Sequence, residues 1–425
     1  MFWVAPYIQG GGIDSPRPAS QRAAAFILTA AMLITLAAPA FAETWYIENG
    51  DITVKAGETG NDVTQNNVTT KNDTDTIITN QKTDTASSNT VTIDAGSDKV
   101  EVTLKDVNID TSSRNKAAVS VTGSGNTTIK LDGDNHLTGG NGIYSNSIGS
   151  LTISGGTVTA TGGGSTGSNG LGGRGIYSNG SVTISGGTVK AAGGDGSDGG
   201  SGISSSSGVT VSDGTVTANG GNSTGSYGSG GDGIRSDGGV TISGGTVTAA
   251  GGDSKDGYGG DGIRSDGGVT ISGNTVNAAG GNGGNVGGYG ICSFDRVAIS
   301  GGTVEAAGGS SGSSNGGSGI YSSVIDLSGS LELTAKAGSP NGKALSQRGN
   351  ELDLNTIKDK LGPGAKVTTT DADGKVIAQV PIPRPVEPEE PSSSSDGGSA
   401  APSAPVSPLP GLTVTDKDGQ RISYT

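Results

Sequence analysis

The amino-acid sequence predicts an all-β protein, a single-stranded parallel β-helix with about 29 residues in each coil. Three observations lead to this prediction. The chain of 425 residues contains 81 glycines but only 31% hydrophobic residues, which is poor material for an ordinary globular core. Three short motifs recur in a fixed order. No proline lies between Pro39 and Pro340, as expected where every strand N–H takes part in a ladder.

The repeat consists of Gly-Ile, then Val-Thr-Ile-Ser-Gly-Gly, then Thr-Val-Thr-Ala, or close variants of these. The second and third motifs lie 5 residues apart in the first six repeats, whereas 14 to 18 residues lead to the next Gly-Ile. A coil that stacks on its neighbours keeps its strands to length and lets its loops vary. The key apolar residues are Ile143, Ile176, Ile203, Ile234, Ile263, Ile291 and Ile320 in the first motif, Ile153, Ile184, Val211, Ile242, Ile271, Ile299 and Leu327 in the second, and Val158, Val189, Val216, Val247, Val276, Val304 and Leu331 in the third.

Each motif is expected to form one side of a coil. In Val240-Thr241-Ile242, the two apolar side chains point one way and the threonine the other, because strand side chains alternate. The following Gly-Gly pair turns the chain, since glycine accepts a positive φ without steric cost. Successive coils then stack Ile, Val and Ala about 4.8 Å apart in one narrow continuous core.

The composition of the segments suggests an order of parts along the chain. We expect a signal peptide over 1–42, an N-terminal cap with irregular β-helix coils over 43–140, regular glycine-rich repeats over 141–340, a C-terminal cap over 341–380, a Pro/Ser-rich linker over 381–410 and a short tail over 411–425. Within the C-terminal cap, residues 351–361 are predicted to form a short helix that covers the open end of the stack.

The first 42 residues have the pattern of an export signal. Arg17 and Arg22 precede an apolar run over 23–38, and Ala40-Phe41-Ala42 supplies the small residues of a cleavage site. An uncleaved membrane anchor is the alternative. Both place the remainder outside the cytoplasm, so we expect a secreted or cell-surface protein, with no stable membrane insertion once the signal is removed.

Charge and cysteine usage exclude several classes of function. The net charge is −14 and no basic run of five residues occurs, which argues against a nucleic-acid partner. Cys292 is the single cysteine, so no intrachain disulfide forms, and we interpret it as a substituted surface or strand position. His136, the single histidine, lies far from Cys292 in sequence, which leaves little prospect of a Cys-His or Ser-His catalytic site.

Two stretches resemble a known family. They are Val102–Asp110 followed by Thr128–Leu137, and the Gly-Ile-x-Ser … Val-Thr-Ile-Ser-Gly-Gly-Thr-Val repeat. Together they resemble the carbohydrate-binding β-helix domains of bacterial surface proteins, the group that includes polygalacturonate binders, over about residues 43–340. The resemblance implies a right-handed helix, association with calcium and binding of acidic plant polysaccharide.

Two copies of an acidic motif form the first candidate site. Asp232-Gly-Ile-Arg-Ser-Asp237 recurs as Asp261-Gly-Ile-Arg-Ser-Asp266, 29 residues later, so the copies should stack on adjacent coils. Like charges about 5 Å apart repel unless something neutralises them. Calcium coordinated by Asp232, Asp237, Asp261 and Asp266 is one solution. Ion pairs with Arg235 and Arg264 are the other, and we favour them because both arginines lie inside the motif.

Aromatic residues in the variable loops form the second candidate site. Tyr227, Tyr258 and Tyr289 could stack on sugar rings, assisted by Arg235 and Arg264. They stand 7, 5 and 2 residues before the isoleucine of the next Gly-Ile, which places them in different registers. The segment 193–198 matches the start of a calcium-binding nonapeptide, but we interpret it as a flexible loop because the following apolar residue is missing.

The sequence therefore predicts non-catalytic binding of carbohydrate outside the cell, by a monomer whose partner is a polysaccharide or cell-surface glycan. Calcium is the one cofactor that this interpretation allows. A rigid spacer or adhesin without a sugar site is the main alternative. An enzyme ranks third, since the repeated Asp and Arg motifs indicate a structural role more than a single irregular active site.

Overall fold

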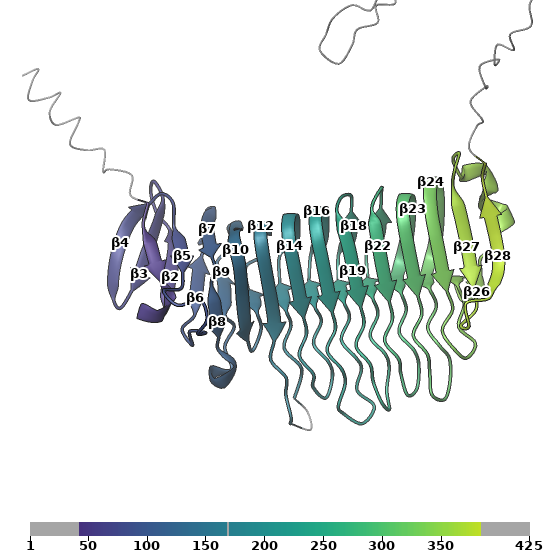
Figure 1. Ribbon diagram of the computed structural model, residues 1–425, viewed down its shortest axis with the longest axis horizontal. Helices are drawn as coiled ribbons and strands as arrows, with labels where there is room; N and C mark the ends of the chain where they lie inside the picture. The colour runs from purple at the N-terminus through teal and green to yellow at the C-terminus, as the bar shows by residue number, and fades with distance from the viewer. Residues whose placement is uncertain (1–41, 168–169, 384–425) are drawn as a thin grey trace, which may run out of the picture. The chain divides into compact units, whose positions relative to one another are not determined.

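The computed structural model describes residues 42–167 and 170–383, and these form a parallel β-helix in which each coil pairs with the coils before and after it (Figure 1). Residues 1–41 of the predicted signal peptide and the predicted tail lie outside these residues, as does the linker beyond residue 383. Successive first strands pair as Ile143–Ile176–Ile203–Ile234–Ile263–Ile291–Ile320. The steps are 33, 27, 31, 29, 28 and 29 residues, which confirms the predicted period of about 29.

The first part of the described chain is less regular than the repeats. Its strands are β1 (Thr44–Tyr46), β2 (Ile52–Ala56), β3 (Asn61–Gln65), β4 (Val68–Asp73), β5 (Ile77–Thr79), β6 (Val91–Asp94), β7 (Val100–Lys105), β8 (Asn108–Asp110), β9 (Val119–Thr122) and β10 (Thr127–Gly139), with 3-10 helices η1 (Ile47–Asn49) and η2 (Ser112–Arg114). Strands β2, β3 and β4 pair in antiparallel fashion and close the N-terminal end, whereas β5 to β10 pair in parallel.

The repeats differ in how far their strands are fused. The short first strands are β11 (Ile143–Ser145), β13 (Ile176–Ser178), β15 (Ile203–Ser205), β17 (Ile234–Ser236) and β20 (Ile263–Ser265). In three coils, one bent strand forms both the second and the third side: β12 (Leu151–Gly162), β14 (Val182–Ala192) and β16 (Gly208–Asn219). In the next two coils, two separate strands form these sides: β18 (Gly239–Ile242) with β19 (Thr246–Ala250), and β21 (Gly268–Ile271) with β22 (Thr275–Ala279). All three sides are continuous in β23 (Ile291–Ala307) and β24 (Ile320–Lys336).

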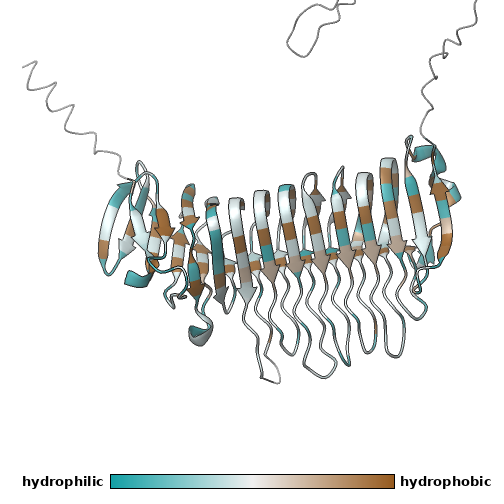
Figure 2. Ribbon diagram, in the orientation of Figure 1, coloured by the Kyte–Doolittle hydropathy of each residue, from teal (hydrophilic) through white to brown (hydrophobic). Residues whose placement is uncertain are grey.

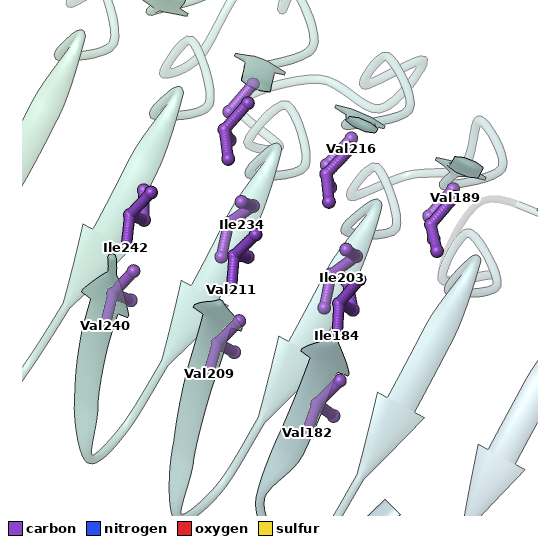
Figure 3. Packing of buried hydrophobic residues seen from close by; sticks show 14 of the residues in the cluster. Val182, Ile184, Val189, Ile203, Val209, Val211, Val216, Ile234, Val240 and Ile242 are labelled. Atoms are coloured by element: carbon purple, nitrogen blue, oxygen red, sulfur yellow. The ribbon is translucent and has the colours of Figure 1, made fainter. Parts of the chain in front are cut away.

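The bend between the second and third sides occurs at the Gly-Gly pairs, as predicted. Gly245 has a φ of +78° and Gly302 a φ of +81°, a conformation that residues with a Cβ rarely adopt. The apolar side chains on either side of the bend then point into the coil. Figure 3 shows Val182, Val209 and Val240 in one row and Ile184, Val211 and Ile242 in another.

The core is the predicted narrow stack of Ile, Val and Ala. Side chains such as Ile184, Ile242 and Val247 have no exposed surface, and the buried apolar residues form one continuous cluster. Figure 2 shows the hydrophobic bands on the strands, whereas the loops on one side of the stack are close to neutral. Because each coil encloses only a narrow core, few apolar residues are needed to fill it, which accounts for the low hydrophobic content.

The C-terminal end is closed by β25 (Leu345–Gln347), β26 (Asn350–Glu351), the 3-10 helix η3 (Leu354–Lys360), β27 (Lys366–Thr370) and β28 (Val376–Pro381). The helix predicted over 351–361 is therefore present as η3, where Asp353 accepts a hydrogen bond from the Asn355 N–H and Leu354 and Ile357 are buried. Strands β27 and β28 pair in antiparallel fashion, so the parallel ladder does not end as an open edge.

The loops that lead from the third side of each coil to the next Gly-Ile are ordered arms, which we call the glycine arms: residues 163–175 apart from 168–169, 193–202, 220–233, 251–262, 280–290 and 308–319. Their backbones form a chain of hydrogen bonds that alternates within and between coils. Gly231 N–H donates to Gly221, Gly252 N–H to Gly231 and Gly260 N–H to Gly252, at 2.8 to 2.9 Å. Figure 1 shows the arms side by side below the strands.

The segment 193–198 belongs to one of these arms, so the prediction of a flexible loop there is wrong. The carboxylate of Asp195 accepts a hydrogen bond from the Asn222 N–H at 2.6 Å, and that of Asp198 accepts one from the Ser229 N–H at 2.7 Å. Both donors lie on the next coil. The sequence alone could not show this order, because the partners come from stacking and not from local propensity.

Candidate functional site

A groove of about 810 Å³ lies between the first strands of the coils from β17 to β25 and the glycine arms beside them. Its charged and aromatic lining consists of Asp232, Asp261, Arg235, Arg264, Lys343, Tyr258, Tyr289 and Tyr321. Backbone of the arms supplies much of the remaining wall, including Gly259, Gly287 and Gly316. Because those residues carry no side chain, their backbone atoms line the groove on this side.

Two columns of side chains build the strand wall of the groove. The first column stands just before Gly-Ile and contains Asp232, Asp261 and Tyr289, since the Asp261 N–H bonds the Asp232 carboxylate and the Tyr289 N–H bonds the Asp261 carboxylate. The second column stands just after Gly-Ile and contains Arg235, Arg264, Cys292 and Tyr321, which pair in register along β17, β20, β23 and β24. The acidic side chains thus lie in the first column and the basic side chains in the second.

Asp232 and Asp261 are buried, although both are charged residues in neighbouring coils. Each carboxylate accepts one backbone N–H from the next coil, at 2.8 Å for Asp232 and 2.7 Å for Asp261. Burial raises the pKa of Asp232, and burial together with the charge of Asp232 raises the pKa of Asp261 to about 7. A carboxyl pair of this kind holds a proton at a pH where exposed carboxyl groups have lost theirs.

The two arginines pair with the acidic motif, and the four aspartates differ in burial. Arg264 Nη1 lies 3.4 Å from Asp261 Oδ2, and Arg235 lies 4.0 Å from Asp232 and 3.8 Å from Asp237. Asp237 and Asp266 are exposed, so the two predicted aspartate ladders are one buried and one exposed. In residues 42–167 and 170–383, no three His, Cys, Asp or Glu side chains converge as metal ligands would.

The three predicted tyrosines occupy three different positions. Tyr289 lies in the aspartate column, where its ring stacks on that of Tyr321 with centroids 4.8 Å apart and planes 17° from parallel. Burial raises its pKa to about 12, so it remains a phenol. Tyr258 lines the groove from the arm and is half exposed. Tyr227 is 79% exposed and lies outside the groove lining.

Sequence reasoning did not select Tyr321 or Lys343 for the site. Tyr321 follows Gly-Ile directly, as Tyr144 and Tyr177 do, and its position in the second column could have been inferred from that register. Tyr144 and Tyr177 form a similar stacked pair, with centroids 5.3 Å apart, at coils away from this groove. No comparable signal marks Lys343, because the chain leaves the repeat pattern there.

Cys292 lies on a strand, as predicted, but it is not a surface residue. It occupies the second column between Arg264 and Tyr321 and has no exposed surface. Burial raises the pKa of its thiol well above the ordinary range. The thiol is therefore protonated and inert in the folded protein.

Comparison with known proteins supports the fold. A family model described as the beta helix repeat matches residues 151–173, 182–207 and 240–263. The chain is a parallel β-helix with repeats similar to that family. No curated protein and no solved structure matches it. Among the helices of the described residues, none has both the length and the apolar character needed to cross a lipid bilayer.

Proposed function

We propose that this β-helix binds acidic polysaccharide in the groove and does not cleave it. The observation that carries the proposal is the stacked Tyr289–Tyr321 pair beside Arg264, with Arg235, Lys343 and Tyr258 in the same groove. Tyrosine rings offer flat apolar faces with a polar edge, which suits sugar rings at a wet surface. Guanidinium groups form paired hydrogen bonds with carboxylates, which suits uronic acids.

The distribution of charge supports an anionic ligand at this place. The whole chain carries a net charge of −14, yet three cationic side chains border the groove. An anion would be repelled by most of such a surface and attracted locally. Since no three described His, Cys, Asp or Glu side chains gather as metal ligands would, we assign recognition of charge to arginine and lysine and treat calcium as a variable to test.

The test is binding of the protein to acidic and neutral polysaccharides of matched length, measured by co-sedimentation and titration, with calcium or with a chelator. Tyr321→Ala should weaken binding of the acidic polymer about tenfold, ~1.4 kcal/mol, because it removes one of the two stacked rings. Tyr177→Ala is the matched control, since Tyr177 has the same register and a similar stack away from the groove. Equal effects of the two changes would refute the assignment.

Two further parts of the proposal have their own tests. We place the protein at the cell surface or in the medium, and mass determination of the exported product would show whether residues 1–42 are removed. Incubation with acidic polysaccharide should leave the length of the polymer unchanged. Appearance of shorter chains would replace binding with catalysis.

A rigid spacer or adhesin is the second candidate, and the continuous ladder of coils favours it. Strands pair without interruption from β11 to β24, and the glycine arms extend the hydrogen bonding beyond the coil. This function would be supported instead if the folded protein bound none of the polymers and if Tyr321→Ala did not change its binding.

A further inference from the structure

The glycine arms show how this fold stacks acidic side chains without accumulating charge. Asp195 accepts the Asn222 N–H at 2.6 Å, Asn222 accepts the Asp253 N–H at 2.8 Å, and Asp253 accepts the Asn282 N–H at 2.7 Å. Asp and Asn alternate, so Asp253 has a neutral amide side chain on the coil before it and another on the coil after it. An Asn side-chain oxygen accepts the same backbone N–H as a carboxylate does, without the charge.

The groove departs from this alternation. Asp232 and Asp261 occupy adjacent coils, where neighbouring strands lie about 4.8 Å apart, and both are buried. Arg264 is the one close cation, since it lies 3.4 Å from Asp261. Arg235 is more distant, at 4.0 Å from Asp232, and it also pairs with Asp237. Two buried carboxylates with one close cation retain an uncompensated charge, which burial makes costly.

A proton removes that charge. A protonated Asp is close to Asn in shape and charge, so a protonated pair reproduces the Asp–Asn step of the arms. Burial and mutual repulsion raise the pKa of Asp261 to about 7, which agrees with one proton retained near neutral pH.

We infer that Asp232 and Asp261 share one proton and that this proton belongs to the binding site: an anionic glycan binds the protonated pair and is released when the pair loses its proton. The inference rests on the proposed function for its ligand, but the shared proton itself does not. The ligand's carboxylate and the aspartates compete for the same guanidinium groups. When one aspartate of the pair is protonated, Arg235 and Arg264 are free to bind the ligand. When both aspartates are charged, they hold the two arginines in ion pairs.

The other charged and titratable groups around the pair are few. They are Arg235 and Asp237 on and after β17, Tyr258 in the arm that precedes β20, Arg264 and Asp266 on and after β20, Cys292 on β23, Tyr289 just before that strand, Tyr321 on β24 and Lys343 at the end of the groove. Burial keeps the Cys292 thiol and the Tyr289 phenol protonated across the neutral range. Asp237 and Asp266 are exposed, and the charge of Asp266 adds to the rise in the pKa of Asp232. The pair is therefore the group that changes charge near pH 7.

The first experiment follows the proton in the ligand-free protein. Carboxyl carbon NMR of ¹³C-labelled aspartate should show one resonance that titrates near neutral pH and disappears in Asp261→Asn. Asp253→Asn, in the alternating ladder of the arms, is the control and should leave that resonance in place. Titration of every aspartate below pH 5 would overturn the shared proton.

The second experiment measures binding of acidic polysaccharide, the class tested above, between pH 5 and pH 9. Affinity should be constant below about pH 7 and fall up to about tenfold for each pH unit above it, the limit for one proton taken up with the ligand. Asp261→Asn should bind with an affinity that does not change over this range, and Asp253→Asn should behave like the unmodified protein.

The outcomes separate the two ideas. An unmodified protein whose affinity does not fall above pH 7, or an Asp261→Asn variant that keeps the fall, overturns the coupling. No binding at any pH overturns the proposed function and the coupling together, while the NMR titration still decides whether the pair holds a proton. Circular dichroism of each variant shows whether its coils are folded, and Asp232→Asn repeats the comparison if Asp261→Asn is not.

Discussion

Substitution of one glycine in an arm provides a sharp test of how the arms are held together. In Gly252→Ala, the new Cβ would lie 2.0 Å from the carbonyl oxygen of Gly221, far inside van der Waals contact. The two arms must then separate by about 1 Å or more, since Cβ atoms rarely approach a carbonyl oxygen within 3 Å. The hydrogen bond from the Gly252 N–H to Gly231, now 2.8 Å long, cannot persist unchanged.

The expected cost follows from the bonds at risk. Gly252 donates to Gly231 and accepts from Gly260, and the neighbouring arm bonds move with it. A net loss of about 0.5–1.5 kcal/mol for each of two or three hydrogen bonds gives about 1–4.5 kcal/mol. Because coils of a solenoid interact mainly with their neighbours, the loss should be concentrated in the arms of residues 220–233, 251–262 and 280–290.

Hydrogen exchange is the assay, because it reports the stability of each arm separately. Gly252→Ala should lower protection of the Gly231, Gly252 and Gly260 amides by about tenfold or more, with smaller changes in distant coils. Gly239→Ala is the matched control, since a Cβ there would meet its closest neighbour, the Gly268 oxygen, at an ordinary 3.5 Å. Unchanged protection in Gly252→Ala would refute the view that close backbone contact orders the arms.

Three further predictions follow from burial and charge. Ile271→Ala should destabilise the fold by about 2–5 kcal/mol because the Ile271 side chain has no exposed surface. Thr270 is exposed, so Thr270→Ala should change stability by less than about 0.5 kcal/mol. Similar denaturation midpoints for the two variants would contradict the stacked core. Since the folded pKa of Asp261 is raised, the folded state binds more protons than the unfolded state between about pH 4 and pH 7. Stability should therefore fall as pH rises through this range, and Asp261→Asn should make its urea midpoint less dependent on pH; an equally steep fall in the variant would show that other groups cause it. Cys292 should react with a thiol reagent at neutral pH only after unfolding, because its thiol is buried and its pKa is raised, and rapid labelling of the folded protein would contradict that burial.

The parts of the fold that repeat could be predicted from the sequence. The alternation in Val240-Thr241-Ile242 indicates which side chains are buried, and Gly245 marks the bend. The spacing in sequence between Ile242 and Val247 is the same in the equivalent positions of the first six repeats, which indicates that both residues belong to the coil. These features are local, because strand alternation and the φ of a turn depend on residues next to one another in the chain.

The candidate site could be predicted in part. The 29-residue spacing correctly implied that Asp232 and Asp261 lie on adjacent coils, and Arg264 does pair with Asp261. The identical motif could not show that Asp232 is buried while Asp237 is exposed. Asp232 lies in a glycine arm, where its carboxylate accepts an N–H from the next coil, whereas Asp237 follows the end of β17 and is exposed.

The sequence by itself determined the coil, its period and its core, because each coil repeats the same short-range pattern. The tertiary structure alone decided the order of the glycine arms, the burial of Cys292 and the pairing of Tyr289 with Tyr321. Tyr289 precedes Gly-Ile in one coil and Tyr321 follows Gly-Ile in the next coil, so their rings meet only when the two coils stack. Stacking of coils brings together residues that are far apart in the chain, and the residues next to them in the sequence do not predict the contact.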